Sequence, residues 1–120
     1  MKDQGELIML ACELGAYQDS YLGFWLSDKG VKAVEFLQPH YKDKWQFVSK
    51  SLLLGSPQSD KPGSIMVTTL SSGSGYCGHQ VKYDLSTISS GALSVLAAWG
   101  DEDCYNGIGV GDWPPISLEY

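Results

Sequence analysis

Short segments rich in β-branched, aromatic and aliphatic residues recur along the chain, and turn-forming residues separate them. This feature limits the fold most, because runs of about four to eight such residues between Gly, Pro, Asn, Asp and Ser are typical of strands. Strands at short intervals favour two packed sheets. We therefore predict a mainly β, single-domain antiparallel β-sandwich, with strands at Glu6–Glu13, Tyr21–Leu26, Ser64–Leu70, His79–Leu85, Ala92–Ala98, Gly107–Gly111 and Ile116–Tyr120.

Two stretches between these strands carry turn signals. Around Ser27–Gly30 the order of residues predicts a β-hairpin over Phe24–Leu37, with Gly30 in the positive-φ conformation that such turns use. The stretch Ser56–Gly63 contains two prolines together with Asp and Gly, so we expect an irregular loop there.

Two other segments also fit helices. In residues 43–54, Trp45, Val48 and Leu52 recur at helical spacing, and Gly55 stands where a helix C-cap belongs. In residues 90–99, Leu93, Leu96 and Ala97 also share a helical face. An α+β fold with helices near 43–54 and 90–99 is therefore the alternative to the sandwich.

The size and charge of the chain limit its organisation and its partners. At 120 residues with 43% apolar residues, the chain is long enough for one core and too short for two, which predicts one domain over residues 1–120. The net charge of −6 repels a phosphate backbone, so we expect no nucleic acid partner. A basic protein, a neutral glycan or a zwitterionic lipid head group remains compatible with this charge.

The longest apolar run, Leu7–Cys12, is far shorter than the ~20 residues of a membrane-spanning helix, so we expect no transmembrane segment. A secretory signal also fits poorly, because Asp3 and Glu6 lie where positive charge belongs. The expected location is the cytoplasm, or outside the cell after processing. The sequence does not predict an oligomeric state.

The chain has three cysteines, Cys12, Cys77 and Cys104, so at least one thiol is free. Buried reduced cysteines are the favoured interpretation, and one unassigned disulfide remains open. Cys77 and His79 are two residues apart on an expected strand and would share one side of it. Cysteine beside histidine is the minimal nucleophile and base, which makes a small Cys-dependent hydrolase one alternative function.

The most acidic segment is Asp101–Gly107. It does not match an EF-hand loop, because the fifth, sixth and twelfth positions from Asp101 are Tyr105, Asn106 and Asp112. We interpret it as a solvated acidic turn and predict no metal and no cofactor.

Aromatic residues gather around the same acidic segment. Trp and Tyr on loops above a rigid sheet are a common means of holding sugar rings, choline groups or membrane interfaces. We predict no catalytic residues and a ligand-binding set of Tyr83, Trp99, Asp101, Asp103, Tyr105, Asn106 and Trp113.

The segments Val81–Leu85, Leu93–Leu96 and Trp99–Val110 together resemble the actinoporin-like β-sandwich proteins, a group that includes the aegerolysins. The resemblance implies lipid or glycan recognition, with Tyr83, Trp99, Tyr105 and Trp113 as contacts. Two features depart from the actinoporins. Ala98 and Gly100 lie near the places where they carry a Ser and a Pro of the head-group site, and Met1–Cys12 fits a strand where they have an amphipathic helix.

The residues together favour a non-enzymatic binding domain that recognises a membrane head group, a glycan or a protein through its aromatic and acidic loop. The first alternative is an acidic inhibitor or immunity-type protein that binds a basic enzyme, since carboxylates steer such complexes. The second alternative is the hydrolase using Cys77 and His79.

Overall fold

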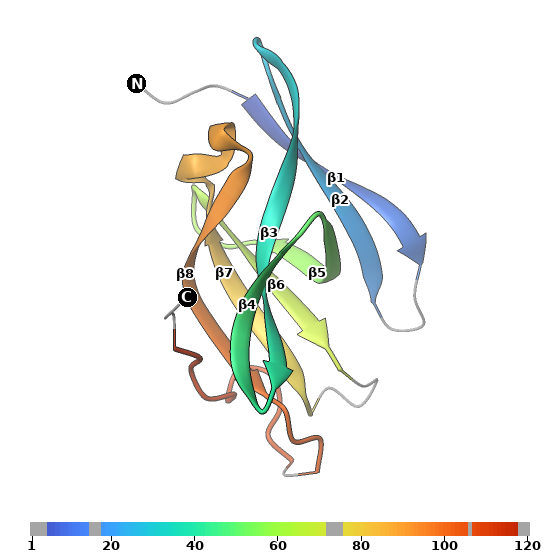
Figure 1. Cartoon of the computed structure of the whole chain (residues 1–120), viewed down its shortest axis with the longest axis vertical. Helices are drawn as coiled ribbons and strands as arrows, with labels where there is room; N and C mark the ends of the chain where they lie inside the picture. The colour runs from blue at the N-terminus through green and yellow to red at the C-terminus, as the bar shows by residue number, and fades with distance from the viewer. Residues whose placement is uncertain (1–4, 15–17, 72–75, 106, 118–120) are drawn as a thin grey trace.

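In the computed structural model of this chain, eight strands are followed by an extended C-terminal segment (Figure 1). The structure describes residues 5–14, 18–71, 76–105 and 107–117. The elements are β1 (Gly5–Leu14), β2 (Asp19–Ser27), β3 (Gly30–Lys42), β4 (Lys44–Lys50), β5 (Leu52–Ser59), β6 (Ser64–Leu70), β7 (Gly78–Asp84), the 3-10 helix η1 (Leu85–Ser90) and β8 (Ala92–Asp101). The prediction of a mainly β chain is confirmed.

Six of the strands close into a barrel. Their order around it is β2, β5, β6, β7, β8 and β3, and a second pairing of β3 with β2 completes the circle. The pairing of β3 with β8, through Glu35–Phe36 and Ala92–Leu93, is parallel, whereas the other strand pairs are antiparallel. A closed barrel therefore stands in place of the expected sandwich of two separate sheets.

Two strands lie outside this closed circle. β1 pairs with β2 along nearly its whole length and extends the sheet on the outer side of β2 (Figure 1). β4 pairs with the second half of β3, and Asp43, at φ 63°, makes the tight turn between them. β1 and β4 are thus the two terminal strands of the sheet order.

The helical alternative is wrong for both segments. Residues 44–50 form β4, where Trp45 and Phe47 pack toward the core at a period of two. Residues 92–101 form β8, where Leu93 and Val95 are buried and a bulge opposite Lys82–Tyr83 leaves Leu96 exposed. The bulge adds one residue to β8 and so breaks the alternation of its side chains. This is why the apolar residues Leu93, Leu96 and Ala97 have the spacing of a helix in the sequence.

The first half of the expected loop at Ser56–Gly63 is strand, since β5 extends to Ser59. Up to Gly55, β5 pairs with β2, and from Ser56 to Ser59 it pairs with β6. Gly55 lies at this change of partner with φ 136°, and a Cβ there would meet the Thr68 carbonyl oxygen at 2.5 Å. The positive φ of Gly55 therefore serves a bend in a strand and not a helix cap.

Buried polar side chains bond the backbone of β5 beside this bend. Gln38 donates through Nε2 to the Leu52 carbonyl at 2.9 Å, and Thr69 donates through Oγ1 to the Leu54 carbonyl at 2.6 Å. Both side chains are less than a tenth exposed. Their hydrogen bonds satisfy polar groups that would otherwise be costly to bury.

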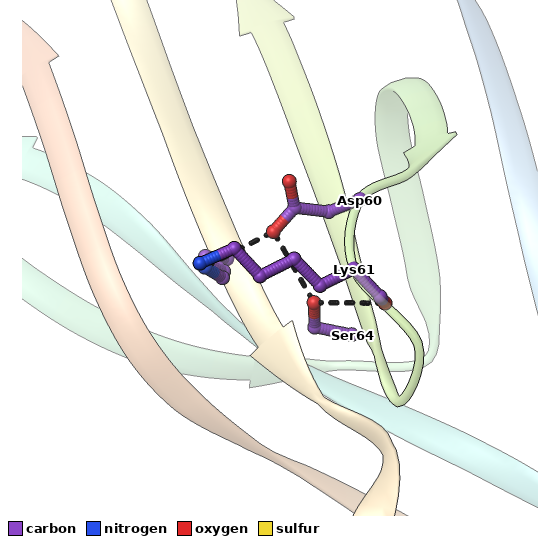
Figure 2. Close-up of polar contacts among 4 residues, drawn as sticks. Asp60, Lys61 and Ser64 are labelled. Atoms are coloured by element: carbon purple, nitrogen blue, oxygen red, sulfur yellow. Dashed lines mark hydrogen bonds and ion pairs between the residues drawn. The ribbon is translucent and has the colours of Figure 1, made fainter.

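A short turn at residues 60–63 joins β5 to β6. Asp60 Oδ2 accepts a hydrogen bond from the Ser64 hydroxyl at 3.2 Å and pairs with Lys82 Nζ of β7 at 3.0 Å. Figure 2 shows Asp60, Lys61 and Ser64 at this turn. The hydrogen bond with Lys82 lowers the pKa of the Asp60 carboxyl. These contacts link the β5–β6 turn to the neighbouring strand β7.

The core fills the barrel and centres on an aromatic pair. Phe36 and Tyr83 are both fully buried, and their rings meet edge to face with centroids 5.9 Å apart. The Tyr83 hydroxyl donates to the Leu37 carbonyl at 2.7 Å, so its polar end is satisfied inside the barrel. Aliphatic residues from five strands surround the pair: Val34, Leu53, Val67, Val81 and Leu93.

Candidate functional site

The chain leaves the barrel after β8 in a long loop and then returns to β8. Gly100 donates its amide to the Pro114 carbonyl at 2.9 Å, and Ile116 donates its amide to the Ala98 carbonyl at 2.8 Å. Trp99 forms an isolated bridge with Pro115. Both ends of the segment 101–113, here called the aromatic loop, are therefore fixed on the edge of β8, and the loop projects from one end of the barrel (Figure 1).

A disulfide fixes the middle of the aromatic loop. Cys104 is bonded to Cys77, which lies just before β7, and their Cα atoms are 4.7 Å apart. Cys77 is fully buried. The favoured interpretation of buried reduced cysteines is therefore wrong: Cys77 and Cys104 form the single disulfide that the sequence left open, and Cys12, exposed on β1, is the free cysteine.

This bond bears directly on the hydrolase alternative. A nucleophilic cysteine acts as its thiolate, and Cys77 has no thiol to ionise while it is bonded to Cys104. His79 is mostly buried on β7, with its ring edge to face against Trp45 at 6.3 Å. In the structure, the sulfur of Cys77 is therefore part of a disulfide, and the imidazole of His79 packs against Trp45.

The acidic residues at the start of the aromatic loop hold its backbone. Asp101 Oδ1 accepts a hydrogen bond from the Asp103 amide, and Asp103 Oδ1 accepts one from the Tyr105 amide, each at 2.9 Å. These are two successive Asx turns, in which short acidic side chains replace strand pairing. Among the residues that the structure describes, no group of three or more His, Cys, Asp or Glu is placed to hold a metal ion.

The end of the aromatic loop is fixed by a buried indole. Trp113 is 4% exposed and donates through Nε1 to the Ile108 carbonyl at 2.9 Å. The Asp112 amide donates to the Gly109 carbonyl at 3.1 Å. Residues 108–113 thus fold back on Trp113, and the strand expected at Gly107–Gly111 does not form. The strand expected at Ile116–Tyr120 is absent at residues 116–117, and residues 118–120 lie outside the described part.

Tyr105 is the side chain that the aromatic loop presents most openly, since it is 97% exposed. Its sequence neighbour Cys104 carries the disulfide, and Tyr76, next to the other cysteine, is 46% exposed. Glu102 and Asp103 of the same loop are also exposed. The disulfide therefore brings together two short segments that each carry an exposed tyrosine.

The predicted ligand-binding residues separate into distinct environments. Tyr83 and Trp113 are buried and do not present a surface to a ligand in this structure, and Asp101 is 4% exposed. Trp99 is half-buried on β8, whereas Asp103 and Tyr105 are exposed on the loop. Asn106 lies outside the described residues. The structure thus gathers Asp101, Asp103, Tyr105 and Trp113 in one loop and places Tyr83 in the core.

Sequence reasoning missed Glu102 and Tyr76 as members of this site. Tyr76 is distant in sequence and is brought to the aromatic loop by the pairing of Gly78 with Asp101 and by the Cys77–Cys104 bond. The signal that would have found it is an aromatic residue directly beside a cysteine, repeated at Tyr76–Cys77 and Cys104–Tyr105.

A groove lies between β4 and the C-terminal segment. It is an open groove of about 600 Å³ lined by Lys44, Trp45, Gln46, Phe47, Pro115, Ile116 and Ser117. His79 packs against Trp45 beneath it, and burial, assisted by the charge of Lys50, lowers the pKa of His79 to about 4. The imidazole is therefore neutral at physiological pH, and its Nε2 is buried with no hydrogen-bond partner among the described residues.

Comparisons with protein-family models, curated proteins and solved structures found no match for this chain. The resemblance to actinoporin-like proteins therefore stays a prediction. Within the described residues, no helix is both long enough and apolar enough to cross a membrane.

Proposed function

We propose that this protein is a non-enzymatic binding domain whose aromatic loop docks on a positively charged surface of another protein. The observation that carries the proposal is Tyr105, which is 97% exposed on a loop fixed by a disulfide, two Asx turns and the buried Trp113. A rigid aromatic side chain loses little conformational entropy on binding, and tyrosine is enriched among residues that dominate interface energies.

The charge of the loop supports a basic protein partner over the other ligands. Glu102 and Asp103 are exposed beside Tyr105, and the whole chain carries a net charge of −6. Carboxylates around an aromatic anchor increase the rate of encounter with a basic partner and help to fix its orientation. A lipid head group or a glycan is less well supported, because Trp113 is buried and Trp99 is half-buried, which leaves less aromatic surface for either ligand.

The test is binding to a panel of purified basic proteins, measured by biolayer interferometry at low and high ionic strength. We expect at least one member to bind, with an affinity that falls as salt rises. Tyr105→Ala should weaken that complex by about tenfold or more, as removal of a central tyrosine anchor does. The matched control is Tyr41→Ala, which removes a 41% exposed tyrosine from β3.

Equal binding by the wild type and Tyr105→Ala would show that the aromatic loop is not the docking site. A parallel titration with phosphatidylcholine vesicles and a glycan array tests the other ligands. Salt-resistant binding in either assay, lost in Tyr105→Ala, would replace the basic protein by that ligand while keeping the loop as the site.

A further inference from the structure

The outer face of the sheet around β1 and β2 is apolar over four strands. The register pairs Ile8 with Phe24 and Leu10 with Leu22 across β1 and β2. The same face continues onto β3, where Val31 pairs with Leu26 of β2. It also continues onto β5, where Leu52 pairs with Leu22 of β2. Residues paired directly across antiparallel strands lie on the same side of a sheet. We call this surface the outer face; its apolar members are Ile8, Leu10, Leu22, Phe24, Leu26, Val31, Ala33, Leu52 and Leu54.

The opposite side of the same strands is the side that closes the core. Leu7, Met9, Tyr21 and Trp25 pack against the core cluster, and Leu53 is 1% exposed. The continuous apolar run of β1 thus consists of two apolar faces, of which this chain covers only one. Strands that are apolar on both faces are normally buried on both.

The outer face is exposed well beyond what single surface residues show. Ile8 is 40% exposed, Leu10 54% and Val31 67%, and Leu26, Leu52 and Leu54 are each about two fifths exposed. These six side chains together expose on the order of 500 Å² of apolar surface, which is toward the upper end of the roughly 300 to 600 Å² of the largest apolar patch on an ordinary monomer, a patch that is often functional.

The occupant that fits this surface is a second copy of the chain. With the exposed Ala33 and the half-buried Leu22 and Phe24, the outer face exposes roughly 600 to 700 Å², which approaches the roughly 800 Å² per partner found in stable interfaces. Two sheets pack face to face with their strands nearly aligned, and one patch then meets itself about a twofold axis. Among the described side chains, the acidic residues on this face are Glu6, which pairs with Leu26, and Glu35, which accepts a hydrogen bond from Ser49 of β4.

A lipid surface fits the outer face less well. Proteins that rest in the membrane interface commonly place Trp and Tyr at the head-group level and basic residues nearby. On this face the aromatic residue is Phe24, which is half-buried, whereas Tyr21 and Trp25 turn toward the core. We infer that the protein forms a homodimer in which the outer faces of two chains pack against each other. This interface is separate from the aromatic loop, which stays free to bind a partner.

Sedimentation velocity over a range of concentrations tests the dimer. The wild type is expected at twice the 13.1 kDa of the chain, with the dimer equally stable or more stable at high salt because the contact is apolar. Leu10→Lys and Leu54→Lys, on different strands, should each weaken the dimer by about a hundredfold or more, since each buries unpaired charge twice in the symmetric contact. Both positions are exposed in the single chain, so each variant is expected to fold.

The matched control is Leu96→Lys, which places the same charge at a 47% exposed leucine on β8. We expect this variant to remain a dimer. A wild type that stays monomeric up to about 1 mM overturns the inference, as does a dimer that survives both Leu10→Lys and Leu54→Lys. If the wild type is monomeric, vesicle binding that is lost in Leu10→Lys and kept in Tyr105→Ala would assign the face to lipid instead. Loss of the dimer leaves the Tyr105 binding assay unaffected, so the two proposals fail independently.

Discussion

At the scale of single residues, burial couples the protonation of His79 to folding. Burial, assisted by the charge of Lys50, lowers its pKa from about 6.5 to about 4 in the folded chain. The unfolded chain therefore binds a proton at His79 at a higher pH than the folded chain does. The free energy of unfolding should fall as the pH drops from about 6.5 toward 4, by up to about 3 kcal/mol, and should not depend on His79 above that range.

Urea unfolding of the wild type and of His79→Gln at a series of pH values measures this effect. The variant cannot take up the proton, so its stability should change less than that of the wild type between pH 6.5 and 4. His40→Gln, at an exposed position, is the control and should follow the wild type. Parallel curves for the wild type and His79→Gln would show that the burial of His79 has no energetic consequence.

The environments of the candidate aromatic residues differ in ways that the sequence does not report. Tyr83, Tyr105 and Trp113 are all aromatic, and the sequence does not distinguish them. In the structure, the Tyr83 hydroxyl donates to the Leu37 carbonyl inside the barrel, and the Trp113 indole donates to the Ile108 carbonyl within the aromatic loop. Only Tyr105 is open to solvent. Aromatic side chains supply burial as readily as they supply binding, and composition alone does not separate the two uses.

At the scale of elements, the sequence predicted strands best where side chains alternate and the backbone is regular. The expected strand Ser64–Leu70 has the bounds of β6, and the hairpin expected over Phe24–Leu37 forms from β2 and β3. The failures lie where pairing is irregular. Gly55 bends β5 between two partner strands, and the bulge at Leu96 breaks the period of β8. Such bends depend on partners distant in sequence, so local periodicity does not report them.

The disulfide joins two elements and should contribute much of the stability of the aromatic loop. Cys77 and Cys104 are 27 residues apart in sequence, and closing a loop of that length is worth about 3 to 4 kcal/mol in the chain-entropy model. We expect the double variant Cys77→Ala/Cys104→Ala to lose about that much free energy of unfolding in urea. Cys12→Ala, which removes the exposed free thiol, should not change stability.

Reduction supplies an independent check on the same bond. The wild type in excess dithiothreitol should approach the unfolding midpoint of the double variant, because both lack the same covalent link. If the reductant has no effect on the wild type, or destabilises the wild type but not Cys12→Ala, the assignment of the bond to Cys77 and Cys104 would be refuted.

At the scale of the whole molecule, closure of the barrel predicts where the fold resists opening. β6 and β7 are hydrogen-bonded to neighbours on both sides, whereas β1 pairs with β2 alone among the described strands. Amide hydrogen exchange should therefore be slowest in β6 and β7, at rates set by global unfolding. It should be fastest along the outer edge of β1, where opening removes few contacts.

The same experiment separates two ways in which a second chain might attach. Face-to-face packing leaves the outer edge of β1 unpaired, so exchange at its outward amides should not slow as the chain becomes dimeric with rising concentration. Pairing of β1 with β1 of a second copy would protect alternate amides along that edge at dimeric concentrations. Protection of every β1 amide to the level of β7 at low concentration would instead contradict the position of β1 outside the closed circle of six strands.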